Sequence, residues 1–181
     1  MKGFVFTELL AMAEEAIGEA RVDAVLDRLA LESDGAYTAV GNYPCGELMQ
    51  IVEALSVETG LAGAELQRRF GHWVMQVFRE RYGGFFEGKR SALEMLEAVE
   101  GEVHVEVRKL YPDAELPRFV TTRDGQGGVT MDYRSPRPLV PFCLGLIEAC
   151  GAAFGTPLDI VQVPLPGAEV SGARFHVRVA G

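Results

Sequence analysis

The sequence predicts one α+β domain in which helices come first and an antiparallel sheet follows. Apolar residues recur at helical spacing through about residue 111, whereas short β-branched and aromatic runs separated by turns follow residue 118. The chain has 181 residues, 48% of them hydrophobic, which suffices for one buried core. Because helices and strands occupy separate parts of the chain, we expect a four-stranded antiparallel sheet. The expected lobes span about 1–64, all helical, and about 65–181, which holds the sheet.

The helical part is read from its apolar faces. In the first helix these residues recur every three or four positions: Phe6, Leu9, Leu10, Ala13 and Ile17. Gly18 ends that helix. Further helical segments are expected around Val22–Leu29 and over Glu47–Thr59, Ala64–Tyr82, Ser91–Val99 and Glu102–Tyr111. Ser91 and Glu94 form the sequence pattern of a capping box.

The strands are expected in two pairs with a buried helix between them. Arg118–Arg123 and Val129–Arg134 flank the turn residues 124–128, which predicts a β-hairpin. Leu139–Phe154 is read as a buried helix. Leu158–Val163 and Arg174–Val179 form the second pair, joined by the Gly- and Pro-rich segment Pro164–Gly172.

Composition excludes several classes of function. Lys and Arg number 17 against 26 Asp and Glu, so the net charge of −9 disfavours binding to phosphate backbones and predicts no nucleic-acid partner. No run of 18 apolar residues and no signal peptide are visible, so we expect a cytoplasmic protein without a membrane span. The three cysteines, Cys45, Cys143 and Cys150, lack metal or disulfide spacing and are expected to be reduced. For Cys143 and Cys150, two turns apart on one helix, core packing is the first reading and a redox sensor the alternative.

Among the three histidines, His104 is distinguished by its apolar neighbours Val103, Val105 and Val107. A single histidine beside a core is commonly a hydrogen-bonded packing residue. One imidazole cannot hold a bare metal ion, but it can ligate haem iron, because the porphyrin supplies four further ligands. Both interpretations are open at this point. The nearby acidic residues Glu97, Glu100, Glu102 and Glu106 are expected to form a solvated helix face.

A second group of polar residues lies where the first hairpin ends. Tyr133 and Ser135 should point to the same face of their strand, and Arg137 is expected in the first turn of the following helix. Two hydroxyls and a guanidinium in one small volume suit the binding of carboxylates. The alternative interpretation is a strand end with a polar face.

Several segments together resemble one known family. The opening MKGFVFTELL, the turn AVGNYP, the central FGHWVMQVFRERYGGFFEG, the segment VHVEVRKLYPDAELP with His104, YRSPR and GLIEACGAAFG are similar to segments of the H-NOX (haem-nitric oxide/oxygen binding) domains. This gas-sensing module also occurs in soluble guanylate cyclase. YRSPR alone is a weak pattern, but the resemblance extends over essentially the whole chain.

The resemblance implies that haem b binds between a distal helical lobe and a proximal lobe with the sheet. His104 would ligate the iron from the proximal side. Tyr133, Ser135 and Arg137 would bind the haem propionates, and Pro117 would press on the porphyrin. The gas pocket would be lined by Phe142, Val5, Leu9, Val74, Phe78 and Leu146.

The residue at position 142 implies which gases are bound. Family members that bind oxygen stably have a tyrosine hydroxyl there, and Phe142 cannot donate a hydrogen bond. We therefore expect a sensor that binds NO and CO on ferrous haem and excludes O2. Gln76 is the residue that could supply another donor and weaken this prediction.

By analogy with the family, NO weakens the bond between His104 and iron and so shifts the domain between two states. The chain shows no kinase or cyclase segment, so we expect regulation in trans of a sensor histidine kinase or of a diguanylate cyclase or phosphodiesterase. Two alternatives stay open. One is a peroxidase- or oxygenase-like haem enzyme, for which His72 and Glu80 are the one weak acid–base pair. The other is a haem-free domain that binds a hydrophobic carboxylate.

Overall fold

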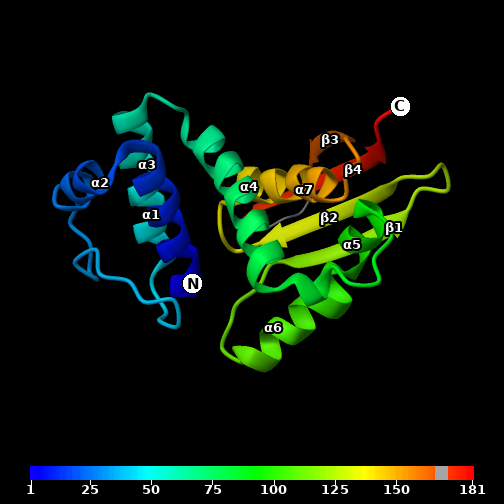
Figure 1. The fold of residues 1–181 in the computed structure, drawn as a ribbon, viewed down its shortest axis with the longest axis horizontal. Coiled ribbons are helices and arrows are strands. Elements are labelled where there is room, and N and C mark those ends of the chain that lie inside the picture. Colours follow the sequence, from blue (N-terminus) through cyan, green and yellow to red (C-terminus); the bar gives the residue numbers. More distant parts are fainter. Residues whose placement is uncertain (166–170) are drawn as a thin grey trace.

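The computed structural model describes residues 1–165 and 171–181 and confirms the α+β order (Figure 1). The helices before the sheet are α1 (Gly3–Ile17), α2 (Glu19–Leu26), α3 (Cys45–Thr59), α4 (Gly63–Arg81), the 3₁₀ turn η1 (Gly83–Phe85), α5 (Ala92–Ala98), the π-helical turn η2 (Val99–Val103) and α6 (His104–Leu110). The remaining elements are β1 (Arg118–Arg123), β2 (Val129–Ser135), α7 (Val140–Ala153), β3 (Leu158–Pro164) and β4 (Ser171–Val179). Residues 166–170 of the expected connection between the last two strands lie outside the described residues.

The four strands form one antiparallel sheet in the order β1-β2-β4-β3. In the centre of the sheet, Tyr133 of β2 lies opposite Phe119 of β1 and Ala173 of β4. Alternate residues of β2 are buried, from Val129 to Ser135, because successive side chains of a strand point to opposite faces. The buried face therefore carries Tyr133 and Ser135 together, as the sequence predicts.

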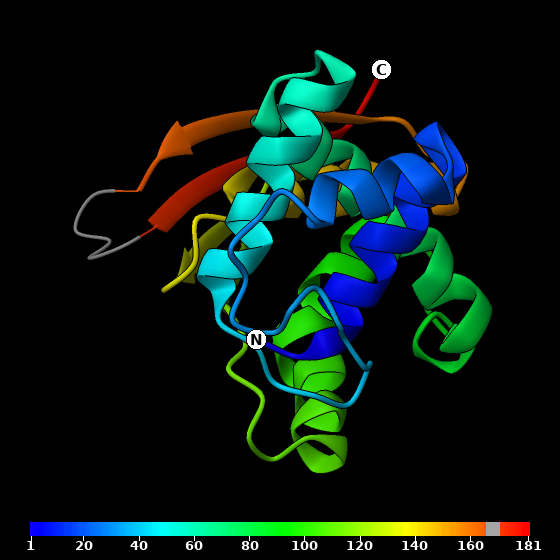
Figure 2. The ribbon, with the colours of Figure 1, turned by 90° about the vertical axis from the view of Figure 1, so that its left-hand side faces the viewer.

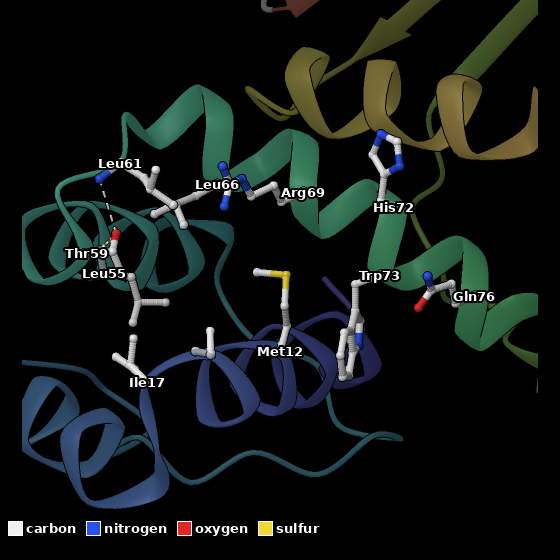
Figure 3. A pocket seen from close by; sticks show the side chains of 12 residues that line it. Met12, Ile17, Leu55, Thr59, Leu61, Leu66, Arg69, His72, Trp73 and Gln76 are labelled. Carbon is white, nitrogen blue, oxygen red and sulfur yellow. Dashed lines mark hydrogen bonds between the residues drawn. The ribbon is translucent and has the colours of Figure 1, made fainter. Parts of the chain in front are cut away.

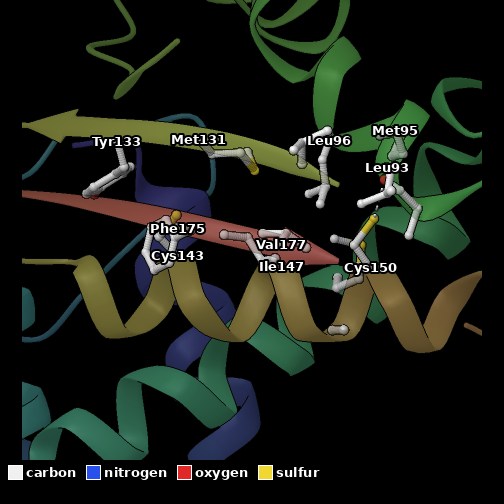
Figure 4. Close-up of a cluster of buried hydrophobic side chains, with 14 of the residues drawn as sticks. Leu93, Met95, Leu96, Met131, Tyr133, Cys143, Ile147, Cys150, Phe175 and Val177 are labelled. Atoms are coloured by element: carbon white, nitrogen blue, oxygen red, sulfur yellow. Dashed lines mark hydrogen bonds between the residues drawn. The ribbon is translucent and has the colours of Figure 1, made fainter. Parts of the chain in front are cut away.

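A hydrophobic cluster fills the space between this face and the helices α5 and α7 (Figure 4). Phe175 and Val177 of β4 meet Ile147 and Cys150 of α7 there, and all four are at most 2% exposed. Cys143 and Cys150 both lie in this cluster. Burial raises the pKa of Cys150 to about 12, so its thiol stays protonated and packs as a small apolar group.

A second cluster joins α1, α2 and α3 to α4. In Figure 1 the first three helices stand to the left of the rest of the molecule as a separate layer, and in Figure 2 this layer faces the viewer. Two carboxylates are buried there with partners: Glu8 accepts from Trp73 Nε1 and Arg81, and Glu47 accepts from Ser33 and Tyr37. Helix α4 contributes to both clusters, because Leu66, Phe70 and Val74 belong to this one and Met75 to the other.

Glycines allow α4 and α7 to pack closely. A Cβ atom at Gly145 of α7 would lie 2.0 Å from the carbonyl oxygen of Arg68 of α4. A Cβ atom at Gly71 of α4 would lie 2.4 Å from the carbonyl oxygen of Phe142. Any side chain at either position would push the two helices apart, so the glycines set the distance between α4 and α7.

Two local predictions differ from the structure. The helix expected from Glu102 begins at His104, because residues 99–103 form a wider π-helical turn. At the start of α5, Ser91 Oγ accepts a hydrogen bond from the backbone N–H of Glu94, but the Glu94 carboxylate bonds the N–H of Arg90 instead of that of Ser91. Only half of the capping box therefore forms.

The segment between α6 and β1 is tied to the N-terminus. Asp113 lies in that segment and forms an ion pair with Lys2, whose Nζ is 2.8 Å from its Oδ1. Asn42 Nδ2 donates to the same carboxylate at 2.6 Å.

Among the described residues, no helix is both long and apolar enough to cross a bilayer.

Candidate functional site

His104 is the first residue of α6 and only 9% exposed. Its Nδ1 lies 3.1 Å from Oε2 of Glu100, and its ring lies against Phe119 with the ring centroids 5.7 Å apart. Burial lowers the pKa of His104 and outweighs the opposing effect of Glu100, so the imidazole is neutral near pH 7. With Nδ1–H donating to the carboxylate, Nε2 keeps its lone pair. The described residues place no hydrogen-bond partner at Nε2, which leaves it available as a ligand atom.

Tyr133, Ser135 and Arg137 form the second half of the site, and each is less than 9% exposed. The Tyr133 ring packs against Phe119, with a centroid distance of 5.4 Å, so that Phe119 lies between Tyr133 and His104. Burial raises the pKa of Tyr133, which keeps its hydroxyl protonated and able to donate. The backbone N–H of Arg137 donates to Ser135 Oγ at 3.1 Å.

The sequence predicts Arg137 in the first turn of a helix, but the structure places it in a bend three residues before α7. Pro138 follows it, and a residue before proline is disfavoured in helical conformation. The bend directs the guanidinium to Glu115, where it donates to the backbone carbonyl at 2.5 Å and to Oε2 at 2.7 Å. The Arg137 side chain is 10% exposed, whereas that of Glu115 is 75% exposed. A buried guanidinium whose acidic partner is exposed to solvent is well placed to donate hydrogen bonds to a further carboxylate.

Pro117 lies half-buried, one residue before β1 and two residues after Glu115. It therefore belongs to the same connecting segment that contacts Arg137. The structure thus places Pro117, His104 and the three polar residues on adjoining elements: α6, the α6–β1 segment, β2 and the bend after it.

The six expected pocket residues come from α1, α4 and α7, and all belong to or pack against the cluster of the helical layer. Leu9 and Val74 are buried, and the other four are half-buried: Val5, Phe78, Phe142 and Leu146. Phe142 packs against Phe70 with a centroid distance of 5.0 Å. None of the six side chains can donate a hydrogen bond.

Gln76 is exposed and lines a different cleft, of about 290 Å³, between α1, α3 and α4 (Figure 3). Apart from Arg69, His72 and Gln76, its walls are largely apolar, from Met12 and Leu55 to Trp73. None of the expected haem-site or gas-pocket residues lines it.

His72 belongs to this cleft rather than to a catalytic pair. Its Nε2 lies 3.0 Å from Oε2 of Glu148, which also accepts two hydrogen bonds from Arg68. Glu80 is exposed and is not its partner in the described part of the chain. The acid–base pair considered for a haem enzyme is therefore not formed.

Sequence reasoning missed two carboxylates at the site. Glu100 was expected to be solvated with its acidic neighbours, which is wrong, because it bonds His104, Arg108 and the N–H of Phe119. Its spacing of four residues from His104 was the available signal. Glu115 has no such signal, because its contact with Arg137 spans 22 residues.

The residues present fit haem. The chain offers one buried imidazole, and no group of three or more His, Cys, Asp or Glu side chains among residues 1–165 and 171–181 could hold a bare metal ion. An iron atom at His104 would thus need a porphyrin for its other ligands. The hydroxyls of Tyr133 and Ser135 and the Arg137 guanidinium are the donors that two propionates require.

Comparisons with known proteins agree with this chemistry. The family model described as Haem-NO-binding matches residues 2–162. The H-NOX protein of K. algicida, crystallised as an A71G mutant in the Fe(II) unliganded state, is 33% identical, with a TM-score of 0.92 over 100% of this chain and 97% of that one. The Shewanella woodyi H-NOX, in its IWP-051-bound Fe(II)CO state, is also 33% identical, with a TM-score of 0.84 over 99% and 95%.

The S. oneidensis H-NOX in the Fe(II)NO state is 20% identical, with a TM-score of 0.90 over 100% of both chains, and supports the fold. A comparison with curated protein sequences found no match. Because the family model covers most of the residues and the site chemistry fits haem, the chain belongs to the H-NOX family of haem-based NO and CO sensors.

Proposed function

We propose that this chain is a sensor that binds NO and CO on ferrous haem b, does not hold O2, and regulates a signalling protein in trans. The observation that carries the proposal is the buried, neutral imidazole of His104 beside the buried donors Tyr133, Ser135 and Arg137. Haem, when bound, supplies the iron at which a gas is captured. The chain's own residues determine how haem is held, which gas is retained and what moves.

His104 would hold the iron through Nε2, while Tyr133, Ser135 and Arg137 donate to the propionates. Arg137 would do so if the exposed Glu115 carboxylate, which accepts from its Nη2, gave way to a propionate. Pro117, fixed between Glu115 and β1, would press on the porphyrin and hold it away from its relaxed shape.

Gas selectivity follows from the lack of donors in the pocket. Bound O2 carries partial negative charge and is stabilised by a hydrogen bond, whereas NO and CO need none. Phe142 takes the place where a tyrosine would donate, and Val74 and Phe78 on α4 are equally apolar. Gln76 is exposed in another cleft and cannot substitute. The pocket therefore favours NO and CO over O2.

The output would begin when His104 leaves the iron and α6 is freed. The segment after α6 is joined to the N-terminus through Asp113, Lys2 and Asn42, so motion of α6 bears directly on the distal lobe. We place the distal lobe at about residues 1–64 and the proximal lobe at about 65–181. A partner would sense the change if it binds the two lobe arrangements with different affinity. A sensor histidine kinase or a diguanylate cyclase or phosphodiesterase is the partner that we propose.

Absorption spectra of the purified, reduced protein test the proposal. We expect a Soret band that shifts with NO and with CO and is unchanged in air until the iron oxidises. His104→Gly should lose the native band and regain it with added imidazole, whereas His176→Gly on the exposed sheet face should match the wild type. A stable oxy spectrum would refute the selectivity. A wild type that shows no Soret band after reconstitution would refute haem binding and favour a carboxylate-binding domain without haem.

Partner regulation needs a separate experiment. With a candidate histidine kinase, NO should change autophosphorylation only in the presence of the wild-type chain. If His104→Gly, loaded with haem and imidazole, still switched the kinase in response to NO, release of His104 would not be the signal.

A further inference from the structure

Glu100 contacts His104 but has no role in the haem binding proposed above. It lies in the π-helical turn η2, four residues before His104, and its side chain is 33% exposed. Its Oε2 is 3.1 Å from Nδ1 of His104 and accepts from the N–H of Phe119, also at 3.1 Å. Its Oε1 accepts from Nη2 of Arg108 at 2.8 Å. One carboxylate thus joins η2, α6 and β1.

The carboxylate that reaches the ring nitrogen belongs to the π-helical turn, four residues before His104. Such turns insert a residue into a helix and occur frequently at functional sites. Of the other two donors to the carboxylate, Arg108 belongs to α6, whereas the Phe119 N–H belongs to strand β1 of the sheet. The imidazole is therefore anchored at Nδ1 to a part of the molecule outside its own helix.

A carboxylate on the far nitrogen of a metal-ligating histidine has two general effects. It fixes the tautomer and the ring orientation, and it makes the ligating nitrogen more basic, so the bond to the metal is stronger. We propose that Glu100 is a positioning residue for His104, and that its carboxylate sets how firmly His104 is held at iron and how readily NO displaces it. This inference rests on the proposed function as a haem sensor.

Arg108 and His104 both bond the Glu100 carboxylate, so replacing Arg108 and replacing Glu100 should change the bond between His104 and iron in opposite directions. Arg108 draws electron density from the carboxylate that His104 uses. Removing the guanidinium leaves Glu100 a better acceptor, whereas removing the charge of Glu100 leaves His104 a poorer donor to iron. A merely structural role for this cluster would not produce changes of opposite sign.

The experiment compares Glu100→Gln with Arg108→Met, using Glu102→Gln as the matched control. Glu102 is on the same turn, 62% exposed, and bonds Lys89 instead of the histidine. The iron–histidine stretching frequency of the reduced, unliganded protein is measured by resonance Raman spectroscopy. We expect a lower frequency in Glu100→Gln, a higher one in Arg108→Met, and no change in the control.

Two further readouts follow the same order. The fraction of the NO complex that has lost His104 should rise in Glu100→Gln, and transfer of haem to an excess of apomyoglobin should accelerate about tenfold or more. Frequencies that are equal in the wild type and in both Glu100→Gln and Arg108→Met would overturn the inference while leaving haem sensing intact. If Glu100→Gln fails to fold, Arg108→Met decides alone: an unchanged or lower frequency refutes the role of Glu100. A wild type without a Soret band refutes the proposed function instead.

Discussion

Replacing Gly145 by alanine tests how closely α4 and α7 are packed. The new Cβ would lie 2.0 Å from the carbonyl oxygen of Arg68, at least 1 Å inside the 3.0 Å that real Cβ contacts keep. Both atoms are held by backbone, so the helices must separate. Overpacking of this kind costs about 1–3 kcal/mol, and more where backbone must shift. For a chain of this size the melting temperature should fall by about 2–12 °C.

Urea unfolding of the haem-loaded protein, followed by circular dichroism, measures the loss. The control is Gly46→Ala near the start of α3, where a Cβ meets nothing within 4 Å. That change should be neutral or stabilising by up to about 1 kcal/mol, because alanine favours helix. The reasoning is wrong if Gly145→Ala is as stable as Gly46→Ala with the same dependence on urea. Because Phe142 and Leu146 flank this contact, the affinity of the Gly145 variant for CO should also differ from that of the control.

Three further predictions concern single contacts. Phe142→Tyr should strengthen O2 binding about tenfold or more, seen as an oxy spectrum in air that the wild type does not give, since a hydrogen bond to a charged group contributes about 1.5–3 kcal/mol; spectra identical to the wild type would mean that position 142 does not face the bound gas. Ser91→Ala should lower stability by about 1 kcal/mol, because Ser91 Oγ caps α5, and equal urea midpoints would contradict this. The Arg174 guanidinium, 2.6 Å from Asp132, holds the pKa of Asp132 below its ordinary 3.8. The wild type should therefore have a higher free energy of unfolding than Asp132→Asn above pH 3.8, and this difference should disappear as the pH falls through the lower folded-state pKa. Urea unfolding of both proteins at about pH 7 and about pH 2 measures the difference. A difference that does not depend on pH would refute this role of Arg174.

Elements that depend on local pattern were predictable. The hairpin β1–β2 follows from β-branched residues on either side of the turn residues 124–128, and the structure confirms it. The packing of helices that are far apart in the sequence could not be predicted in the same way. The approach of α4 to α7 depends on Gly71 and Gly145, which are 74 positions apart and carry no side chain that periodicity could detect.

In the candidate site too, residues placed by local pattern were predictable and the others were not. Tyr133 and Ser135 share a strand, so the two-residue period places them on one face. Arg137 lies outside the predicted helix because Pro138 disfavours helical conformation at the residue before it, an effect that the apolar pattern of α7 does not show. Glu100 bonds His104 four residues later, although neighbouring acidic residues on a helix face are usually solvated, and its bond to the N–H of Phe119 joins residues that are 19 positions apart.

The contact between Gly71 and Gly145 also has a mechanical meaning. Helix α4 is 19 residues long, about 28 Å, and Gly71 lies near its middle, about 12 Å from its first residue. A rigid rod that touches its support near its centre is a balanced lever. If α4 tilts by about 5° on α7, its two ends move in opposite directions by roughly 1 Å each. Leu66 lies toward one end of α4 and Phe78 toward the other, so such a tilt would displace the pocket at Phe78 and the cluster at Leu66 in opposite directions.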